Sequence, residues 1–184
     1  SAGKILLALA RGASADHLRN AFAESGVIET LIGMLQLESH STKHNAALIL
    51  RILCREPLLR RCLLDQGGLG VLVDMMHNCP EEDEKVSAAQ VIGEVARDLD
   101  MRLEIFHSGI VPVLLSHLND DDCPYNVRLV SVEVLCLLAE VDTLRDLLVK
   151  AGIINILKSL SSKASGLLKE FSNDLLRRCE GAGW

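Results

Sequence analysis

Aromatic residues are scarce in this chain of 184 residues, which has one Trp, one Tyr and three Phe. Its core must therefore be built from Leu, Ile, Val and Ala. Only four prolines are present, and this suits a mostly helical chain, because a proline inside a helix removes a hydrogen bond. Strands would bring more Thr, Tyr and Phe. These shortages predict an all-α protein.

The chain also lacks an excess of positive charge and any long apolar run. Its formal net charge is -6, which argues against a general nucleic-acid binder, because such proteins carry a basic surface. No apolar run approaches the ~20 residues needed to span a bilayer, and the start has no signal-peptide pattern. Because the sequence begins without Met and inside a predicted helix, we expect a fragment of a longer protein.

Residues in catalytic or metal-binding patterns are missing as well. His77 and Cys79 have no second pair at zinc-ligand spacing, and Gly67 to Gly70 lacks the Lys-Ser/Thr ending and the preceding strand of a phosphate loop. No Gly-x-Ser-x-Gly motif is present. The sequence therefore predicts no enzyme, no catalytic residue, no metal, no cofactor and no small-molecule substrate.

The six cysteines form no Cys-x-x-Cys pair. Cys54 and Cys136 lie in apolar helical runs, where a thiolate would be disfavoured. Free cysteines of this kind behave as small buried hydrophobes and indicate a reducing compartment. We expect a cytoplasmic protein, with the nucleus as the alternative.

One pattern occurs four times along the chain. In each copy an apolar run precedes a glycine, and apolar residues with a Leu five positions later follow it. The glycines are spaced by 41, 42 and 43 residues, at Gly26, Gly67, Gly109 and Gly152. A fixed period of this size is typical of repeat architectures, in which each unit buries its apolar faces against its neighbours.

Helical periodicity divides each unit into a short first helix, a second helix after the glycine and a long third helix. The predicted first helices are 15–25, 57–65, 99–107 and 142–150, and the second helices are 27–37, 68–77, 110–118 and 153–160. The third helices are 43–55, 83–97, 125–140 and 167–179. Ser41 or Thr42 is the expected cap of the first of these third helices, and residues 161–166 are the expected loop before the last.

The glycine segments and the third helices resemble the armadillo repeat family. Runs such as Ala46–Cys54, Ala88–Ala96 and Ser131–Ala139 are similar to the family's Ala-Ala-x-Ala-Leu-x-Asn-Leu-Ala helix. The resemblance implies a right-handed α-solenoid of stacked three-helix repeats. A HEAT-type array is the alternative, but it usually has two helices per unit and lacks this glycine turn. We expect the end of a preceding or truncated repeat at 1–12, repeats at 13–56, 57–98, 99–141 and 142–180, and a tail at 181–184.

The resemblance also implies that the third helices line a concave groove that holds an extended peptide. The positions that match the family's groove Trp are Leu48, Gln90 and Glu133, and those that match its groove Asn are Ile52, Glu94 and Leu137. None of them is Trp or Asn. The family's Asn clamps the backbone of the ligand, so a nuclear-import-type receptor for basic peptides is a less favoured alternative.

A second set of residues lies in register near the C-terminal ends of third helices. It comprises Arg11, Arg55 and Arg97, with Glu140 in the fourth copy, and Lys4 and Arg51 lie one or two turns earlier. Cations also favour helix C-termini that are exposed to solvent. These residues can therefore lie either on a solvated rim or in the groove, and the sequence does not decide between the two. If they face the groove, paired hydrogen bonds from Arg favour an acidic or acidic-apolar ligand, while Glu94, Glu133 and Glu140 favour basic groups.

Taken together, these patterns predict a non-enzymatic scaffold or adaptor that binds a protein or peptide partner through the groove. The alternative is a self-association or intramolecular regulatory module of a larger protein. That module would use the apolar residues Ile5, Leu6 and Leu9 near the N-terminus.

Overall fold

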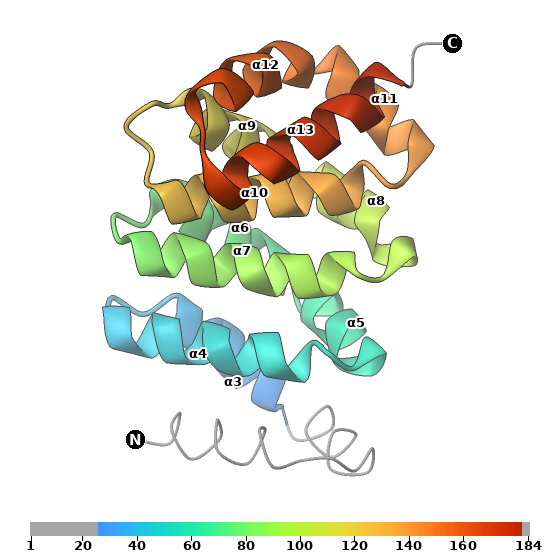
Figure 1. The fold of residues 1–184 in the computed structure, drawn as a ribbon. Helices are drawn as coiled ribbons and strands as arrows, with labels where there is room; N and C mark the ends of the chain where they lie inside the picture. Colours follow the sequence, from blue (N-terminus) through green and yellow to red (C-terminus); the bar gives the residue numbers. More distant parts are fainter. Residues whose placement is uncertain (1–25, 182–184) are drawn as a thin grey trace. The chain divides into compact units, whose positions relative to one another are not determined.

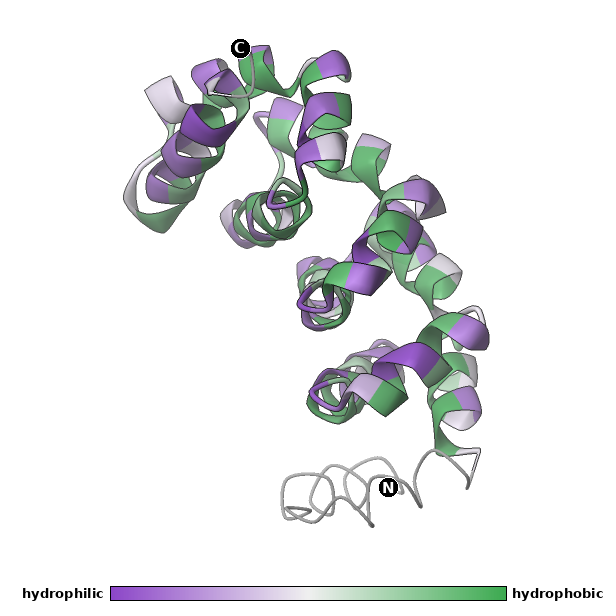
Figure 2. Cartoon of the chain, turned by 90° about the vertical axis from the view of Figure 1, so that its right-hand side faces the viewer, coloured by the Kyte–Doolittle hydropathy of each residue, from purple (hydrophilic) through white to green (hydrophobic). Residues whose placement is uncertain are grey.

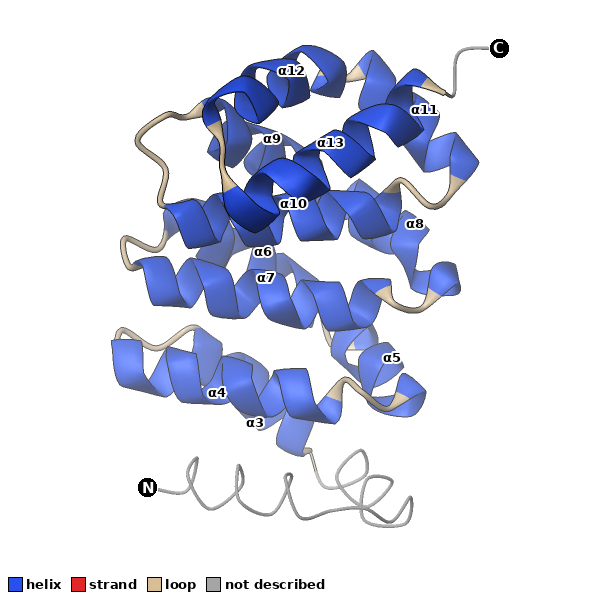
Figure 3. Ribbon diagram, in the orientation of Figure 1, coloured by secondary structure: helices blue, strands red, loops and turns tan. Residues whose placement is uncertain are grey.

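The structure is a computed structural model that describes residues 26–181. The expected helices over 4–11 and 15–25, Lys4, Arg11 and the proposed self-association residues lie outside the described residues. Within 26–181 every regular element is a helix and no strand is present, as Figure 3 shows. None of these helices combines the length and the apolar character that crossing a membrane requires. The chain divides between Asp98 and Leu99 into two units, and each unit is described by itself.

Unit 1 contains five described helices. They are α3 (Val27–Leu35), α4 (His40–Leu53), α5 (Pro57–Asp65), α6 (Gly68–Asn78) and α7 (Glu82–Ala96). The third helix α4 packs on the second helix α3, and α7 packs on α6 in the same way. Like helices also stack, α3 on α6 and α4 on α7 (Figure 1). The apolar faces are thus buried between successive copies of the same pattern, as expected for a repeat.

Unit 2 begins with three short segments, η1 (Leu99–Met101), α8 (Arg102–Ile105) and η2 (Phe106–Ile110). Five helices follow, α9 (Val111–Asn119), α10 (Tyr125–Leu138), α11 (Asp142–Lys150), α12 (Ile153–Lys163) and α13 (Gly166–Glu180). Here α10 packs on α9 and on α13, and α12 packs on α9 and on α13. The unit therefore repeats the arrangement of second and third helices found in unit 1.

The predicted glycine turns are confirmed by their backbone angles. Gly26, Gly67, Gly109 and Gly152 have φ of 69°, 74°, 87° and 87°. A Cβ atom placed on any of the four would meet no other atom within 4 Å. Glycine is therefore required at these positions by the left-handed conformation, which costs other residues about 1–2 kcal/mol, and not by close packing.

Several predicted helix bounds are correct and others are wrong. Helices α5 and α11 begin and end at the predicted residues. The predicted cap at Ser41 or Thr42 is wrong, because α4 begins earlier, at His40, and Ser39 caps it by accepting a hydrogen bond from the Thr42 amide. The predicted loop 161–166 is too long, because only residues 164 and 165 lie between α12 and α13. Helix α12 continues to Lys163, and in its last turn the Ser162 hydroxyl donates to the Ser159 carbonyl.

Residues 99–107 were predicted to form one regular helix, and this prediction is wrong. A 3₁₀ turn, one turn of α-helix and a π-type segment replace it. The π-type segment contains Gly109, whose left-handed backbone bends the chain into α9. The sequence period placed the glycine turn correctly, but the helix before the turn is interrupted.

The core consists of aliphatic side chains, as the shortage of aromatics predicted. The largest fully buried side chains in the described residues are Leu, Ile and Met, among them Ile28, Leu31, Ile49, Leu50 and Leu63. Figure 2 shows hydrophobic and hydrophilic residues interleaved along the described helices. Each helix therefore has an apolar face for packing and a polar face for solvent.

Candidate partner-binding surface

The third helices of unit 1 hold most of the predicted groove residues in the described part of the chain. Leu48 and Ile52 on α4 are half-buried, as are Gln90 and Glu94 on α7. Helix α4 packs on α7, so these positions lie on neighbouring helices of the stack. The stacking of two copies of the pattern thus brings together residues that are far apart in the sequence.

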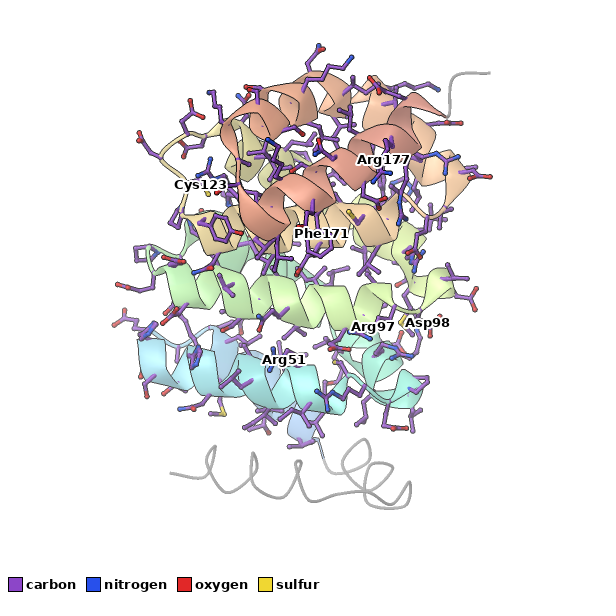
Figure 4. The ribbon with its side chains drawn as sticks, in the orientation of Figure 1. Arg51, Arg97, Asp98, Cys123, Phe171 and Arg177 are labelled. Carbon is purple, nitrogen blue, oxygen red and sulfur yellow. The ribbon has the colours of Figure 1, made fainter. Side chains whose placement is uncertain are left out.

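Arg51 is the predicted groove residue that is bonded most directly to the neighbouring helix. Its Nη1 atom donates a 2.8 Å hydrogen bond to Oε1 of Gln90, and Figure 4 shows Arg51 on the side of α4 that faces α7. Its Nε atom is buried and has no hydrogen-bond partner among the described residues. Arg51 therefore ties α4 to α7 and is less available to a partner than the prediction assumed.

Arg55 and Arg97 are the exposed cations of unit 1 at the predicted register. Arg55 lies just beyond α4. Arg97 is the C-cap residue of α7 and is labelled in Figure 4. Nε of Arg97 lies 2.9 Å from Oε2 of Glu94, one turn earlier on the same helix, and 67% of the Arg97 side chain is exposed. No acidic group of the described residues lies within ion-pair distance of Arg55.

A cavity of about 270 Å³ lies where these helices end, lined by Arg55, Arg60, Glu94 and Arg97. Three arginines and one glutamate therefore line one space in a chain whose net charge is -6. Such an arrangement is suited to an anionic group, because guanidinium donors form paired, charge-assisted hydrogen bonds with carboxylate and phosphate oxygens.

Arg60 was missed by the sequence reasoning, although it forms the buried wall of this cavity. It lies on α5 and is only 9% exposed. Its Nη1 donates to the carbonyl oxygens of Cys54 and Arg55, at 3.1 and 3.3 Å, and its Nη2 lies 3.6 Å from Oδ2 of Asp98. It therefore binds the last carbonyls of the α4 end, which have no partner inside the helix.

A signal for Arg60 was present in the repeat register. Arg102 and Arg145 follow Arg60 at intervals of 42 and 43 residues, and each lies on a first-helix segment. In unit 2, Arg145 repeats the contact, since its Nη1 donates to the Ala139 carbonyl at 3.4 Å just beyond α10. Alignment on the glycines would have found this column of arginines, but nothing in the sequence indicated that it is buried.

Two of the acidic residues of the predicted groove, Glu140 and Glu94, already form ion pairs with arginines of the same unit. In unit 2, Oε2 of Glu140 lies 2.8 Å from Nη2 of the buried Arg102, and its Oε1 lies 3.8 Å from Nη1 of Arg178. In unit 1, Glu94 is paired with Arg97. Basic groups of a ligand would therefore compete with arginines of the same unit for these carboxylates.

The other predicted positions of unit 2 lie on α10. Leu137 is half-buried, and Glu133 reaches solvent. Partial desolvation raises the pKa of Glu133 above its ordinary value. The direction of this shift indicates that neighbouring side chains partly shield the Glu133 carboxyl group from water.

Four of the six cysteines are buried, and Cys62 and Cys136 are partly exposed. All six are free. Burial raises the pKa of Cys54 to about 12 and that of Cys136 to about 12, so both are protonated near neutral pH, as predicted. Within residues 26–181 no group of three or more His, Cys, Asp or Glu side chains has the arrangement of a metal site.

The comparisons with known proteins found matches among solved structures only. No family model matches the sequence, and no curated protein matches it. A computationally designed armadillo repeat protein for modular peptide recognition has a TM-score of 0.79 and 19% identity, over 89% of this chain and 69% of that chain. A designed armadillo repeat protein in complex with the peptide (KR)4 has a TM-score of 0.82 and 19% identity, over 99% and 80%. The armadillo repeats only protein from Plasmodium falciparum has a TM-score of 0.76 and 23% identity, over 96% and 78%.

Proposed function

We propose that this chain, which has the armadillo-repeat fold, is a non-enzymatic scaffold that holds a peptide segment of a partner protein along its third helices. The fold supports a binding role, because designed proteins of the same fold recognise peptides. The ligand we propose is acidic or mixed acidic and apolar. This choice is carried by one observation, the cavity in unit 1 at which Arg55 and Arg97 present exposed guanidinium groups.

Apolar contacts would add to this charge recognition. Leu48 and Ile52 lie on the same helix, upstream of Arg55, and both retain partial exposure. Burial of apolar surface contributes about 25 cal/mol per Å², so a ligand with an apolar residue beside its acidic group would bind both. A basic peptide would instead meet the three arginines of the cavity, which repel it.

Fluorescence anisotropy with labelled peptides tests the proposal. The probes are two random-sequence libraries of equal length, one enriched in Asp, Glu and Leu and the other in Lys, Arg and Leu, and the protein is the full chain. We expect the acidic library to bind more tightly. Arg55→Glu and Arg97→Glu should each weaken that binding by about tenfold or more, since a lost charged contact at an interface costs about 2 kcal/mol.

Arg61→Glu is the matched control, because Arg61 lies on α5 and pairs with Asp65 of the same helix, at 2.8 Å. It makes the same charge change outside the cavity. Circular dichroism of all three variants should retain the helical signal. Equal binding of both libraries, or unchanged acidic binding in both cavity variants, would refute the proposed ligand class.

Two further proposals rest on the sequence. The net charge of -6 argues against nucleic acid as the partner. The six free thiols support a reducing compartment, the cytosol or the nucleus.

A further inference from the structure

The cavity of unit 1 has an excess of positive charge. Its lining residues, three arginines and one glutamate, carry two net positive charges. Glu94 neutralises part of the charge of Arg97, and Asp98 lies near Arg60. Arg55 has no acidic partner among the described residues. The charge of Arg55 is therefore available to an anionic group of a ligand, and the exposed Arg97 lines the same cavity.

One of the arginines that line the cavity has a buried nitrogen without a hydrogen-bond partner in the described part of the chain. Nε of Arg60 has no hydrogen-bond partner among the described residues, while Nη1 and Nη2 of the same side chain are directed to the α4 carbonyls and to Asp98. A buried donor without a partner costs about 1–3 kcal/mol. A ligand oxygen within reach of this N–H would remove that cost.

The C-terminal end of a helix ordinarily repels anions, because its free carbonyl groups carry partial negative charge. Here Arg60 covers two of the carbonyl groups at the end of α4, those of Cys54 and Arg55. Arg97 occupies the C-cap position of α7. The arginines therefore convert a helix end that disfavours anions into a cationic pocket.

From these features we infer that the cavity binds the phosphate group of a phosphorylated serine or threonine in the partner peptide. This inference rests on the proposed function and specifies its ligand. A phosphate monoester carries about -1.5 to -2 charge at pH 7 and three acceptor oxygens. With its larger charge and third oxygen it can engage the arginines that line the cavity more strongly than a carboxylate, which has one charge and two oxygens. The volume of about 270 Å³ accommodates such a group.

A peptide array provides the test. Each random-sequence peptide is synthesised three times, with serine, phosphoserine or glutamate at its centre, and the array is probed with the labelled full chain. Dissociation constants of the best triplets are then measured by fluorescence anisotropy. We expect the phosphoserine peptide to bind about tenfold more tightly than its glutamate counterpart, since one added charge-assisted hydrogen bond is worth about 1.4 kcal/mol or more.

Arg55→Gln and Arg97→Gln should each remove this preference, whereas Arg61→Gln should leave it intact. These variants change exposed side chains and leave the buried Arg60 in place. In nitrogen-edited NMR spectra of the wild-type chain, the best phosphopeptide should shift the Nε–H resonance of Arg60, and its serine counterpart should not.

The outcomes separate the inference from the function on which it rests. Glutamate and phosphoserine peptides that bind equally well would overturn the phosphate assignment and leave the peptide scaffold in place. A phosphoserine preference that survives both cavity variants would also overturn the assignment. Binding to no peptide of any version would refute the proposed function itself, and the assignment with it.

Discussion

Nη1 of Arg51 donates a 2.8 Å hydrogen bond to Oε1 of Gln90, and these two residues are 39 positions apart in the sequence. The bond joins α4 to α7 across the junction between two copies of the repeating pattern. Both residues were predicted to line the groove for a partner. The structure brings them together with each other, so they contribute to the rigidity of the surface on which a partner would lie.

We expect the effects of Arg51→Ala and Gln90→Ala on the free energy of unfolding to be coupled. A half-buried hydrogen bond to a charged group contributes about 1 kcal/mol or more to the free energy of unfolding. In a double-mutant cycle measured by urea unfolding, the two changes should therefore interact by about 1 kcal/mol. Strictly additive effects would show that the bond does not stabilise the contact between α4 and α7.

Gly67 and Gly70 should respond to alanine in opposite directions. Gly67 has φ of 74°, in the left-handed region, so Gly67→Ala should lower the free energy of unfolding by about 1–2 kcal/mol. Gly70 lies inside α6, where an added methyl group would meet only open space, so Gly70→Ala should raise it by about 0.5–1 kcal/mol. Thermal unfolding followed by circular dichroism measures both, and effects of the same sign would contradict the assignment of the turn.

Glu84 should make the stability of the chain depend on pH in the acid range. Burial alone would raise the pKa of Glu84. Hydrogen bonds from the Cys79 thiol and from His40, together with the ammonium group of Lys43, outweigh burial and lower that pKa below its ordinary value. Because the folded-state pKa is lowered, the stabilisation is present above the unfolded-state pKa of about 4.3 and is lost as the pH falls through the folded-state value.

Urea unfolding over a series of pH values measures this effect. At neutral pH we expect Glu84→Gln to lower the free energy of unfolding by about 1–3 kcal/mol, since it removes a buried charged partner of Lys43. The difference from wild type should shrink as the pH falls below about 4. Glu81→Gln, at an exposed carboxylate just before α7, is the control and should show no such convergence.

Cys54 and Cys62 should differ in their reaction with iodoacetamide. The thiolate is the reactive form, and burial raises the pKa of Cys54 to about 12. Cys54 is fully buried, whereas Cys62 is partly exposed. In the native chain at a mildly alkaline pH, mass spectrometry should find label on Cys62 well before Cys54, and urea should remove the difference. Equal native rates would show that the end of α4 opens readily.

Much of the fold could be predicted because its signals are local. The glycine period located the left-handed turns at Gly26, Gly67, Gly109 and Gly152, and the apolar period located every second and third helix between residues 26 and 181. Errors arose where neighbouring residues offered equivalent choices. Ser39, Ser41 and Thr42 are all good helix caps, and His40 joins α4 through its contact with Glu84 at 3.0 Å, from a residue 44 positions away.

The candidate site was predicted less completely, because its properties depend on pairs of residues from different helices. The register of Arg55 and Arg97 was visible in the sequence. The burial of Arg60, its hydrogen bonds to the end of α4 and the pairing of Arg51 with Gln90 were not. No short-range pattern distinguishes an arginine that faces solvent from one that binds the end of a preceding helix.

The sequence by itself determined the period, the turns and the helical class of this protein, because backbone conformation at glycine and the burial of one helix face are set within a few residues. Only the tertiary structure decided which charges meet. Stacking places residues that are about 40 positions apart in the sequence next to each other. Each arginine can therefore reach acidic groups and carbonyl groups on several helices, and the packing decides which of them it contacts. That selection left Arg55 and Arg97 exposed at one cavity and placed Arg51 inside the fold.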